Sequence, residues 1–127
     1  MLLAALNSDD PLSERARMTL DRSPLLSPFS LLETNLLERA GKLRIINYDE
    51  FSRDLGALLS TFSVRTVNDK PQYHSVARKF ESRFKLTFFD SLHAAVSRVE
   101  GEILASFDRV YDRLEDEGVK RIDPTDL

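Results

Sequence analysis

The sequence of 127 residues contains no cysteine and only two histidines. The absence of cysteine excludes disulfide bonds, thiolate zinc sites and cysteine nucleophiles. The longest uninterrupted apolar run, Met1–Leu6, is far too short to cross a membrane. It is also a poor secretory signal, because no basic residue precedes it and polar residues follow at once. We therefore expect a cytoplasmic protein without a membrane segment.

The sequence also has little net charge, −3 in total, so the chain as a whole does not indicate a nucleic-acid-binding protein. The distribution is less even. Residues 65–85 carry six basic side chains against two acidic ones, and residues 100–127 carry nine acidic side chains against four basic ones. The ordinary interpretation of such runs is a pair of solvated helix faces.

The length fits one domain with one core, and 42% hydrophobic with 31% charged residues is an ordinary globular composition. Apolar spacing, caps and breakers predict short strands alternating with helices, which is typical of an α/β fold with a mainly parallel sheet. The predicted helices cover residues 1–6, 11–21, 28–40, 47–61, 69–84, 88–99 and 109–117, and the predicted strands cover residues 25–27, 62–67, 103–105 and 120–123.

Glu33 is the most informative single residue. It lies on the flank of the stripe that we expect to face inward on its helix, made of Phe29, Leu32, Leu36 and Ala40. A carboxylate there is partly desolvated and needs a cation, a hydrogen-bond network or a metal ion. The alternative is a long side chain that reaches out to water.

Asp90 and Asp108 are two further acidic candidates. Thr87 and Asp90 have the spacing of a capping box, so Asp90 has a structural interpretation as well as a functional one. Asp108 follows the predicted strand 103–105, and ligands of open α/β sheets gather beyond the carboxyl ends of strands. Its structural alternative is a cap on the last helix.

Three carboxylates without cysteine suit a hard cation, Mg²⁺ or Mn²⁺, rather than zinc. Such ions typically serve phosphoryl chemistry by activating water and stabilising the leaving oxygen. His93 lies next to the candidate site and is interpreted as a core residue or as a group supporting the ligands. His74 is interpreted as an ordinary helix residue.

Four segments taken together, in this order and spacing, resemble a PIN domain, most closely the VapC-type toxins. They are LSPFSLLE at residues 26–33, LTFFDSLHAA at 86–95, LASFD at 104–108 and VKRIDP at 119–124. The resemblance covers nearly the whole chain as a single domain. It implies a three-layer α/β fold, with a mainly parallel sheet flanked by helices, and a metal-dependent endoribonuclease that hydrolyses RNA.

By the same resemblance, Glu33, Asp90 and Asp108 are the catalytic and metal-binding residues, for Mg²⁺ or Mn²⁺. Ser106 matches the small hydroxyl residue near the metal, and Asp112 adds an outer carboxylate. Family members usually begin with a strand that ends in a fourth acidic ligand. Here the first strand and its aspartate are missing from the pattern, because residues 1–7 resemble the helix that follows them.

The resemblance also implies partners: an RNA substrate, an antitoxin protein and a second copy of the chain in a homodimer. The basic side chains expected to steer the RNA backbone are Arg78, Lys79, Arg83 and Lys85. Two alternatives stay open. One is a catalytically impaired PIN-like module that binds RNA or protein, and the other is a plain α/β interaction domain whose acidic residues are caps and solvated charges.

Overall fold

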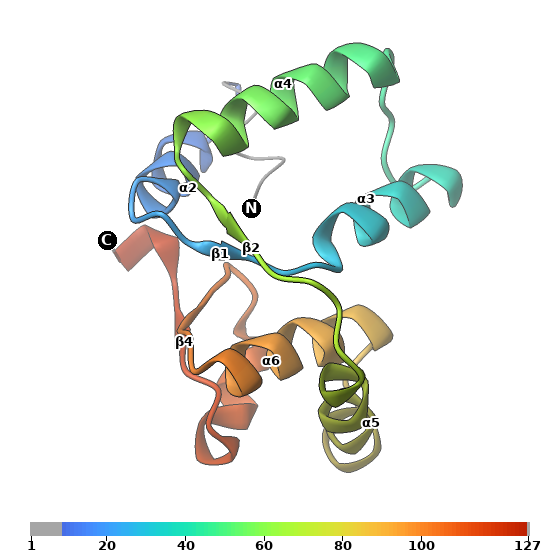
Figure 1. The fold of residues 1–127 in the computed structure, drawn as a ribbon, viewed down its shortest axis with the longest axis vertical. Helices are drawn as coiled ribbons and strands as arrows, with labels where there is room; N and C mark the ends of the chain where they lie inside the picture. Colours follow the sequence, from blue (N-terminus) through green and yellow to red (C-terminus); the bar gives the residue numbers. More distant parts are fainter. Residues whose placement is uncertain (1–8, 127) are drawn as a thin grey trace.

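The structure is a computed structural model and describes residues 9–126, so the helix predicted at residues 1–6 lies outside the described part (Figure 1). The helices are α2 (Ser13–Leu20), α3 (Ser30–Arg39), α4 (Tyr48–Thr61), α5 (Pro71–Phe84), α6 (Phe88–Glu100) and the two 3₁₀ helices η1 (Arg109–Glu117) and η2 (Pro124–Asp126). The strands are β1 (Leu25–Leu26), β2 (Arg65–Thr66), β3 (Leu104–Ala105) and β4 (Arg121–Ile122).

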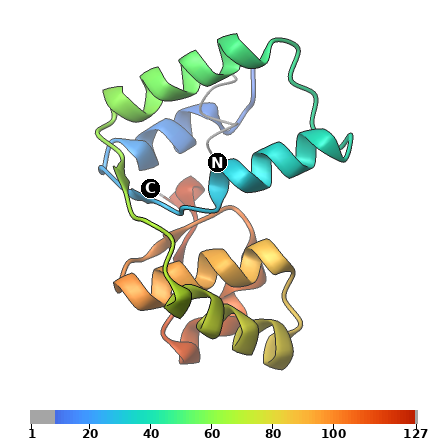
Figure 2. The ribbon, with the colours of Figure 1, turned by 45° about the vertical axis from the view of Figure 1, so that its right-hand side comes forward.

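The predicted α/β fold is confirmed, with helices alternating with short parallel strands. The strands lie between α2 and α4 on one side and α5 and α6 on the other, an arrangement that two views show (Figures 1 and 2). Each predicted element from residue 11 to residue 123 has a counterpart. The strands are shorter than predicted, residues 109–117 form a 3₁₀ helix rather than an α-helix, and η2 was not predicted.

Among the described residues the strands form two separate parallel pairs, β1 with β2 and β3 with β4, rather than one sheet. In a parallel pair, backbone groups of alternate residues point to opposite edges. Leu104 and Ser106 donate to β4, so the N–H and C=O of Ile103 and Ala105 point to the other edge of β3. In β1, the N–H and C=O of Leu25 likewise point to the edge away from β2. Each pair therefore has an edge that can accept a further strand.

The core is continuous along α6, whose inner face packs on α5, η1 and the segment before α3. Ala77 of α5 and Ala94 and Ala95 of α6 are almost fully buried, and their small side chains allow the two helices to approach closely. Tyr73 and Phe80 of α5 fill the space beside them. A second cluster between α2 and α4 contains Ala16, Leu20, Leu55 and Leu58.

The predicted inward stripe on the helix from residue 28 is wrong beyond its first member. Phe29 is buried, but Leu32 and Leu36 are about half exposed, Ala40 is exposed, and α3 buries none of its residues. α3 runs outward from the end of β1 (Figures 1 and 2), and its residues Leu32 and Leu36 are in none of the buried clusters of the part of the chain that the structure describes. Periodicity identifies an apolar face but does not say what it packs against.

The start of α6 depends on Thr87, whose hydroxyl accepts a hydrogen bond from the Asp90 N–H at 3.3 Å. We expect Thr87→Ala to lower the free energy of unfolding by about 1 kcal/mol, the usual effect of losing a cap. Urea denaturation measures the change. Thr87→Ser is the matched control, because it keeps the hydroxyl and should stay close to the unaltered protein. An equal loss in both variants would contradict the capping role.

Candidate metal centre

A cleft of about 520 Å³ opens where the carboxyl ends of β1 and β3 meet the start of α6. Both strands line it, together with the segments that follow them. Its charged lining consists of acidic side chains and one histidine, and the described residues that line it include no lysine and no arginine. The acidic and histidine residues are Glu33, Asp90, Glu102, Asp108 and His93. The three predicted carboxylates therefore line one cleft.

Glu33 lies in the first turn of α3, and its carboxylate binds His93 of α6, with Oε1 3.0 Å from Nε2. The other ring nitrogen of His93 lies 2.7 Å from the hydroxyl of Ser27, just after β1. A neutral imidazole meets both partners when Nε2–H donates to Glu33 and Nδ1 accepts from Ser27. His93 therefore supports Glu33, as predicted, and the contact ties α3, α6 and β1 together.

Asp90 lies in the first turn of α6, and its Oδ1 accepts a hydrogen bond from the Tyr111 hydroxyl at 3.1 Å. Tyr111 is almost fully buried at 4% exposure. Burial raises the pKa of the phenol strongly, and the negative charges of Asp90, Glu33 and Asp108 raise it further. Tyr111 therefore stays a neutral hydrogen-bond donor, and the charges of all three predicted carboxylates act on its phenol. Its position three residues after Asp108 on a helical segment is a signal that the sequence analysis did not use.

Asp108 is the cap of η1, and its Oδ1 accepts from the Val110 N–H at 2.9 Å. Its own N–H donates to the Ser106 hydroxyl at 3.1 Å. The capping alternative for Asp108 is thus confirmed, and it coexists with the cleft. For Asp90 the cap is the Thr87 hydroxyl, which accepts from the Asp90 N–H, while the Asp90 side chain accepts from Tyr111. Both residues are anchored by helix starts whose partial positive charge favours a carboxylate.

The three carboxylates share a pattern of hydrogen bonding. Each uses one oxygen for a protein donor: Oε1 of Glu33, Oδ1 of Asp90 and Oδ1 of Asp108. The second oxygen of each makes no hydrogen bond or ion pair with the part of the chain that the structure describes. Each carboxylate is held in place and still has one oxygen for a ligand.

The donor chemistry of the cleft fits Mg²⁺ or Mn²⁺, which prefer carboxylate oxygens. Over residues 9–126, however, no group of three or more histidine or acidic side chains is gathered closely enough to hold a metal ion. Mg²⁺ commonly takes one or two carboxylates and keeps several waters, so separated carboxylates remain compatible with it. Glu33, Asp90 and Asp108 are the residues that would hold the ion.

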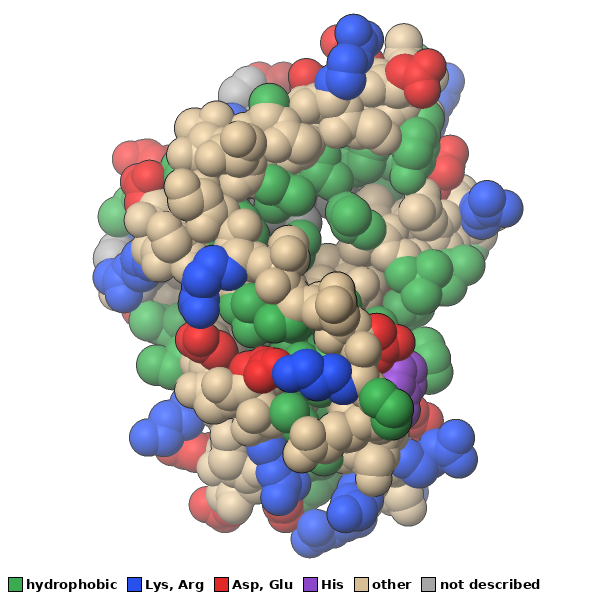
Figure 3. Space-filling view, in the orientation of Figure 1, with side chains coloured by type: hydrophobic (Ala, Val, Ile, Leu, Met, Phe, Trp, Pro, Cys, Tyr) green, Lys and Arg blue, Asp and Glu red, His purple; other side chains and the backbone are tan. Residues whose placement is uncertain are grey.

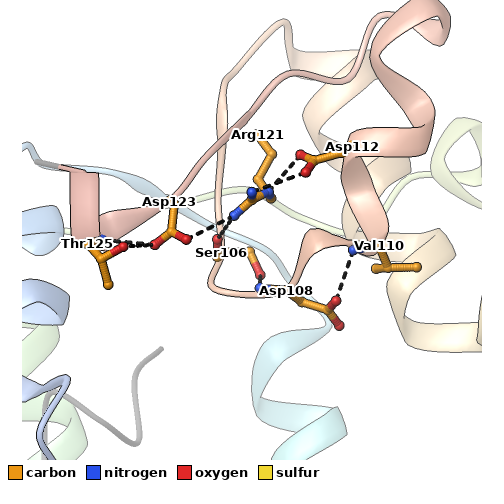
Figure 4. Close-up of polar contacts among 7 residues, drawn as sticks. All are labelled: Ser106, Asp108, Val110, Asp112, Arg121, Asp123 and Thr125. Carbon is orange, nitrogen blue, oxygen red and sulfur yellow. Dashed lines mark hydrogen bonds and ion pairs between the residues drawn. The ribbon is translucent and has the colours of Figure 1, made fainter.

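Asp112, predicted as an outer carboxylate, lies away from the cleft and is engaged by Arg121 (Figure 4). Arg121 Nε and Nη2 donate to the two Asp112 oxygens at 2.8 and 3.2 Å, and Nη1 donates to the Ser106 carbonyl at 2.9 Å. Asp123 lies 3.5 Å from the same Nη1. The guanidinium thereby fixes the loop after β3, in which the predicted supporting residue Ser106 and the ligand candidate Asp108 lie.

The predicted RNA-steering residues lie at the exposed surface and do not line the cleft: Arg78, Lys79, Arg83 and Lys85, on or just after α5. Arg83 forms an ion pair with Glu117 at 3.2 Å. Figure 3 shows lysine and arginine side chains around the end of the molecule where α5 lies. A basic surface and an acidic cleft are therefore separate features of the same domain.

The pairing with Arg121 gives a prediction for acid stability. The hydrogen bond from Arg121 holds the pKa of Asp112 below its usual value of 3.8. Because the folded-state pKa is depressed, the stabilisation is complete above about pH 3.8 and is lost as the pH falls through the lower, folded-state value. Arg121→Met should flatten this acid-dependent part of the urea unfolding curve. Arg113→Met is the control, since Arg113 donates to the carbonyl of Phe84 and pairs with no carboxylate among the described residues. A control variant with the same flattened profile would refute the assignment.

The sequence matches the PIN domain family over residues 1–117. Since the match covers most of the chain, the protein belongs to the PIN domain family. Membership indicates a nuclease, often a ribonuclease, and PIN domains typically use divalent metal ions. No curated protein and no solved structure matches the sequence. None of the helices within residues 9–126 is long and apolar enough to cross a membrane.

Proposed function

We propose that this PIN domain is a metal-dependent endoribonuclease of the VapC type, which hydrolyses RNA phosphodiester bonds. The observation that carries the proposal is the cleft: Glu33, Asp90 and Asp108 line it, and the described lining contains no lysine or arginine. Three carboxylates that share a cleft repel one another. A bound divalent cation removes that repulsion, so the cleft itself favours such a ligand.

A divalent ion in this cleft would activate water and stabilise the leaving oxygen of the phosphodiester. The protein holds the side chains that would bind the ion. Glu33, Asp90 and Asp108 each offer one free oxygen, and His93, Tyr111 and the start of η1 hold the other oxygen of each. Ser106 places its hydroxyl at the Asp108 N–H and fixes the loop that carries this acid.

The resemblance implies that the complete fold has a further strand and a fourth acidic ligand, and two features support this. Both β1 and β3, which within residues 9–126 are each paired along one edge, line the same cleft, and the carboxyl ends of both strands lie beside the acidic residues. An extended segment between them would join the two pairs into one parallel sheet and would end at the carboxylates. We propose that such a segment, which residues 9–126 do not supply, completes both the sheet and the ligand set.

The second candidate is a catalytically impaired PIN-like module that binds RNA or protein. One observation favours it: the described residues contain no gathered group of three metal-binding side chains. The antitoxin partner and the homodimer stay predictions of the resemblance. Metal binding and RNA cleavage separate the two candidates, because the impaired module would bind a partner without turnover.

Asp90→Asn tests the proposed centre. We expect Mn²⁺ to raise the melting temperature of the unaltered protein and to support cleavage of RNA. The variant should lose most of the Mn²⁺-induced shift, and its cleavage rate should fall by about 100-fold, as when one group that stabilises transition-state charge is removed. Without metal, Asp90→Asn should raise the melting temperature, because it removes one of the negative charges that line the same cleft.

Asp54→Asn is the control, because Asp54 is an exposed aspartate of α4 outside the cleft and the same charge is lost. If Mn²⁺ neither stabilises the unaltered protein nor supports cleavage, and Asp90→Asn changes nothing, the enzyme hypothesis fails for this chain. Mn²⁺ stabilisation and RNA binding without cleavage would favour the impaired module.

The basic surface of α5 gives a separate prediction about RNA binding, measured without divalent metal so that no cleavage occurs. Contacts between basic side chains and phosphates release counterions, so affinity falls with salt by a slope of about 0.7 per phosphate on a single strand. Replacing both Arg78 and Lys79 with glutamine should reduce the slope by about 1.4. The matched control replaces Arg44 and Arg53, which are exposed elsewhere. Equal slopes in both variants would exclude a specific role of α5.

A further inference from the structure

Tyr111 lines the cleft, and its hydroxyl donates to the predicted ligand Asp90. It comes from η1, whereas Asp90 comes from α6, so the contact joins two elements that follow each other across β3. The ring is packed with Phe80, Leu86, Ala94, Leu114 and Val119, all buried. Such packing fixes the position of the hydroxyl far better than a surface side chain could.

The chemical character of this donor suits a cation site. A lysine or arginine at this position would also hold the Asp90 carboxylate, but its positive charge would oppose a divalent ion bound by the same carboxylate. A neutral hydroxyl stabilises the carboxylate without that repulsion.

The hydrogen bond also makes the two Asp90 oxygens different from each other. Oδ1 accepts from Tyr111, and no hydrogen bond or ion pair within residues 9–126 engages Oδ2. Partners that hold the second atom of a ligating group fix its orientation and raise its affinity for metal. We propose that Tyr111 is a positioning residue of the metal centre, which holds the Asp90 carboxylate so that its second oxygen is available to the cation. This inference rests on the proposed function.

The test compares two tyrosines in the same chemical setting. Tyr73 is also buried and also donates to a carboxylate, that of Glu100 at 2.7 Å, but it does not line the cleft. Tyr111→Phe and Tyr73→Phe each delete one hydroxyl, so both should lose some thermal stability. Only Tyr111→Phe should weaken Mn²⁺ binding, by about tenfold at the lower end of the effects known for such supporting residues. Isothermal titration with MnCl₂ measures the affinity.

The outcomes separate this inference from the function on which it rests. If Asp90→Asn weakens Mn²⁺ binding but Tyr111→Phe does not, the positioning role is overturned while the metal centre stands. Equal weakening in both tyrosine variants would also overturn it, because the effect would then follow stability. If the unaltered protein does not bind Mn²⁺, or Asp90→Asn leaves binding unchanged, the metal centre fails and the positioning role fails with it.

A second measurement uses the unaltered protein and does not depend on a folded variant. With ¹³C-labelled tyrosine rings, titration with Mg²⁺ should shift the Cζ resonance of Tyr111 along the same saturation curve as an isothermal titration with MgCl₂. The Cζ resonance of Tyr73 should not move. A Tyr111 resonance that stays fixed while Mg²⁺ binds would contradict the proposal.

Discussion

Helix starts hold the three predicted metal ligands that line the cleft, and the other features of the site depend on this arrangement. Glu33 and Asp90 lie in the first turns of α3 and α6, and Asp108 caps η1. The partial positive charge of each helix start favours a carboxylate by about 0.3–1 kcal/mol. That contribution, with one hydrogen-bond donor for each residue, lets three anions occupy a cleft whose described lining lacks lysine and arginine. The remaining repulsion is what a divalent cation would relieve.

The packing of α6 explains why this geometry can be held. One face of the helix carries the alanines that bring α5 close, and its first two turns carry Asp90 and His93, which line the cleft. A change in the core therefore moves a ligand candidate as well as the core itself. Arg121 also contributes both to the fold and to the site, since its guanidinium binds Asp112 and the carbonyl of Ser106. The site is supported by ordinary structural contacts on two sides.

Much of the fold followed from local patterns in the sequence. The Thr87–Asp90 spacing predicted the start of α6, and the glycine after it predicted the end, because Gly101 has the positive φ of +68° that a C-terminal cap requires. Local patterns could not identify tertiary partners. They placed Leu32 and Leu36 inside, although both are about half exposed, and they did not reveal that Arg121 engages Asp112. They found the acidic residues, while Tyr111, which contacts Asp90 from another element, required the three-dimensional structure.

The two open strand edges and the carboxylates are connected by the geometry of parallel strands. Because β1 and β3 both end beside the acidic residues, any extended segment that pairs with them in parallel also ends there. The same segment would then complete both the sheet and the set of metal ligands. Each would stabilise the other through thermodynamic linkage: a cation bound at the carboxyl ends favours the joined sheet, and the joined sheet brings the ligands to the cation. Such linkage predicts that the ligands are not gathered while the strands form two separate pairs. Residues 9–126 show both features: they contain no gathered group of three metal-binding side chains, and their strands form two pairs.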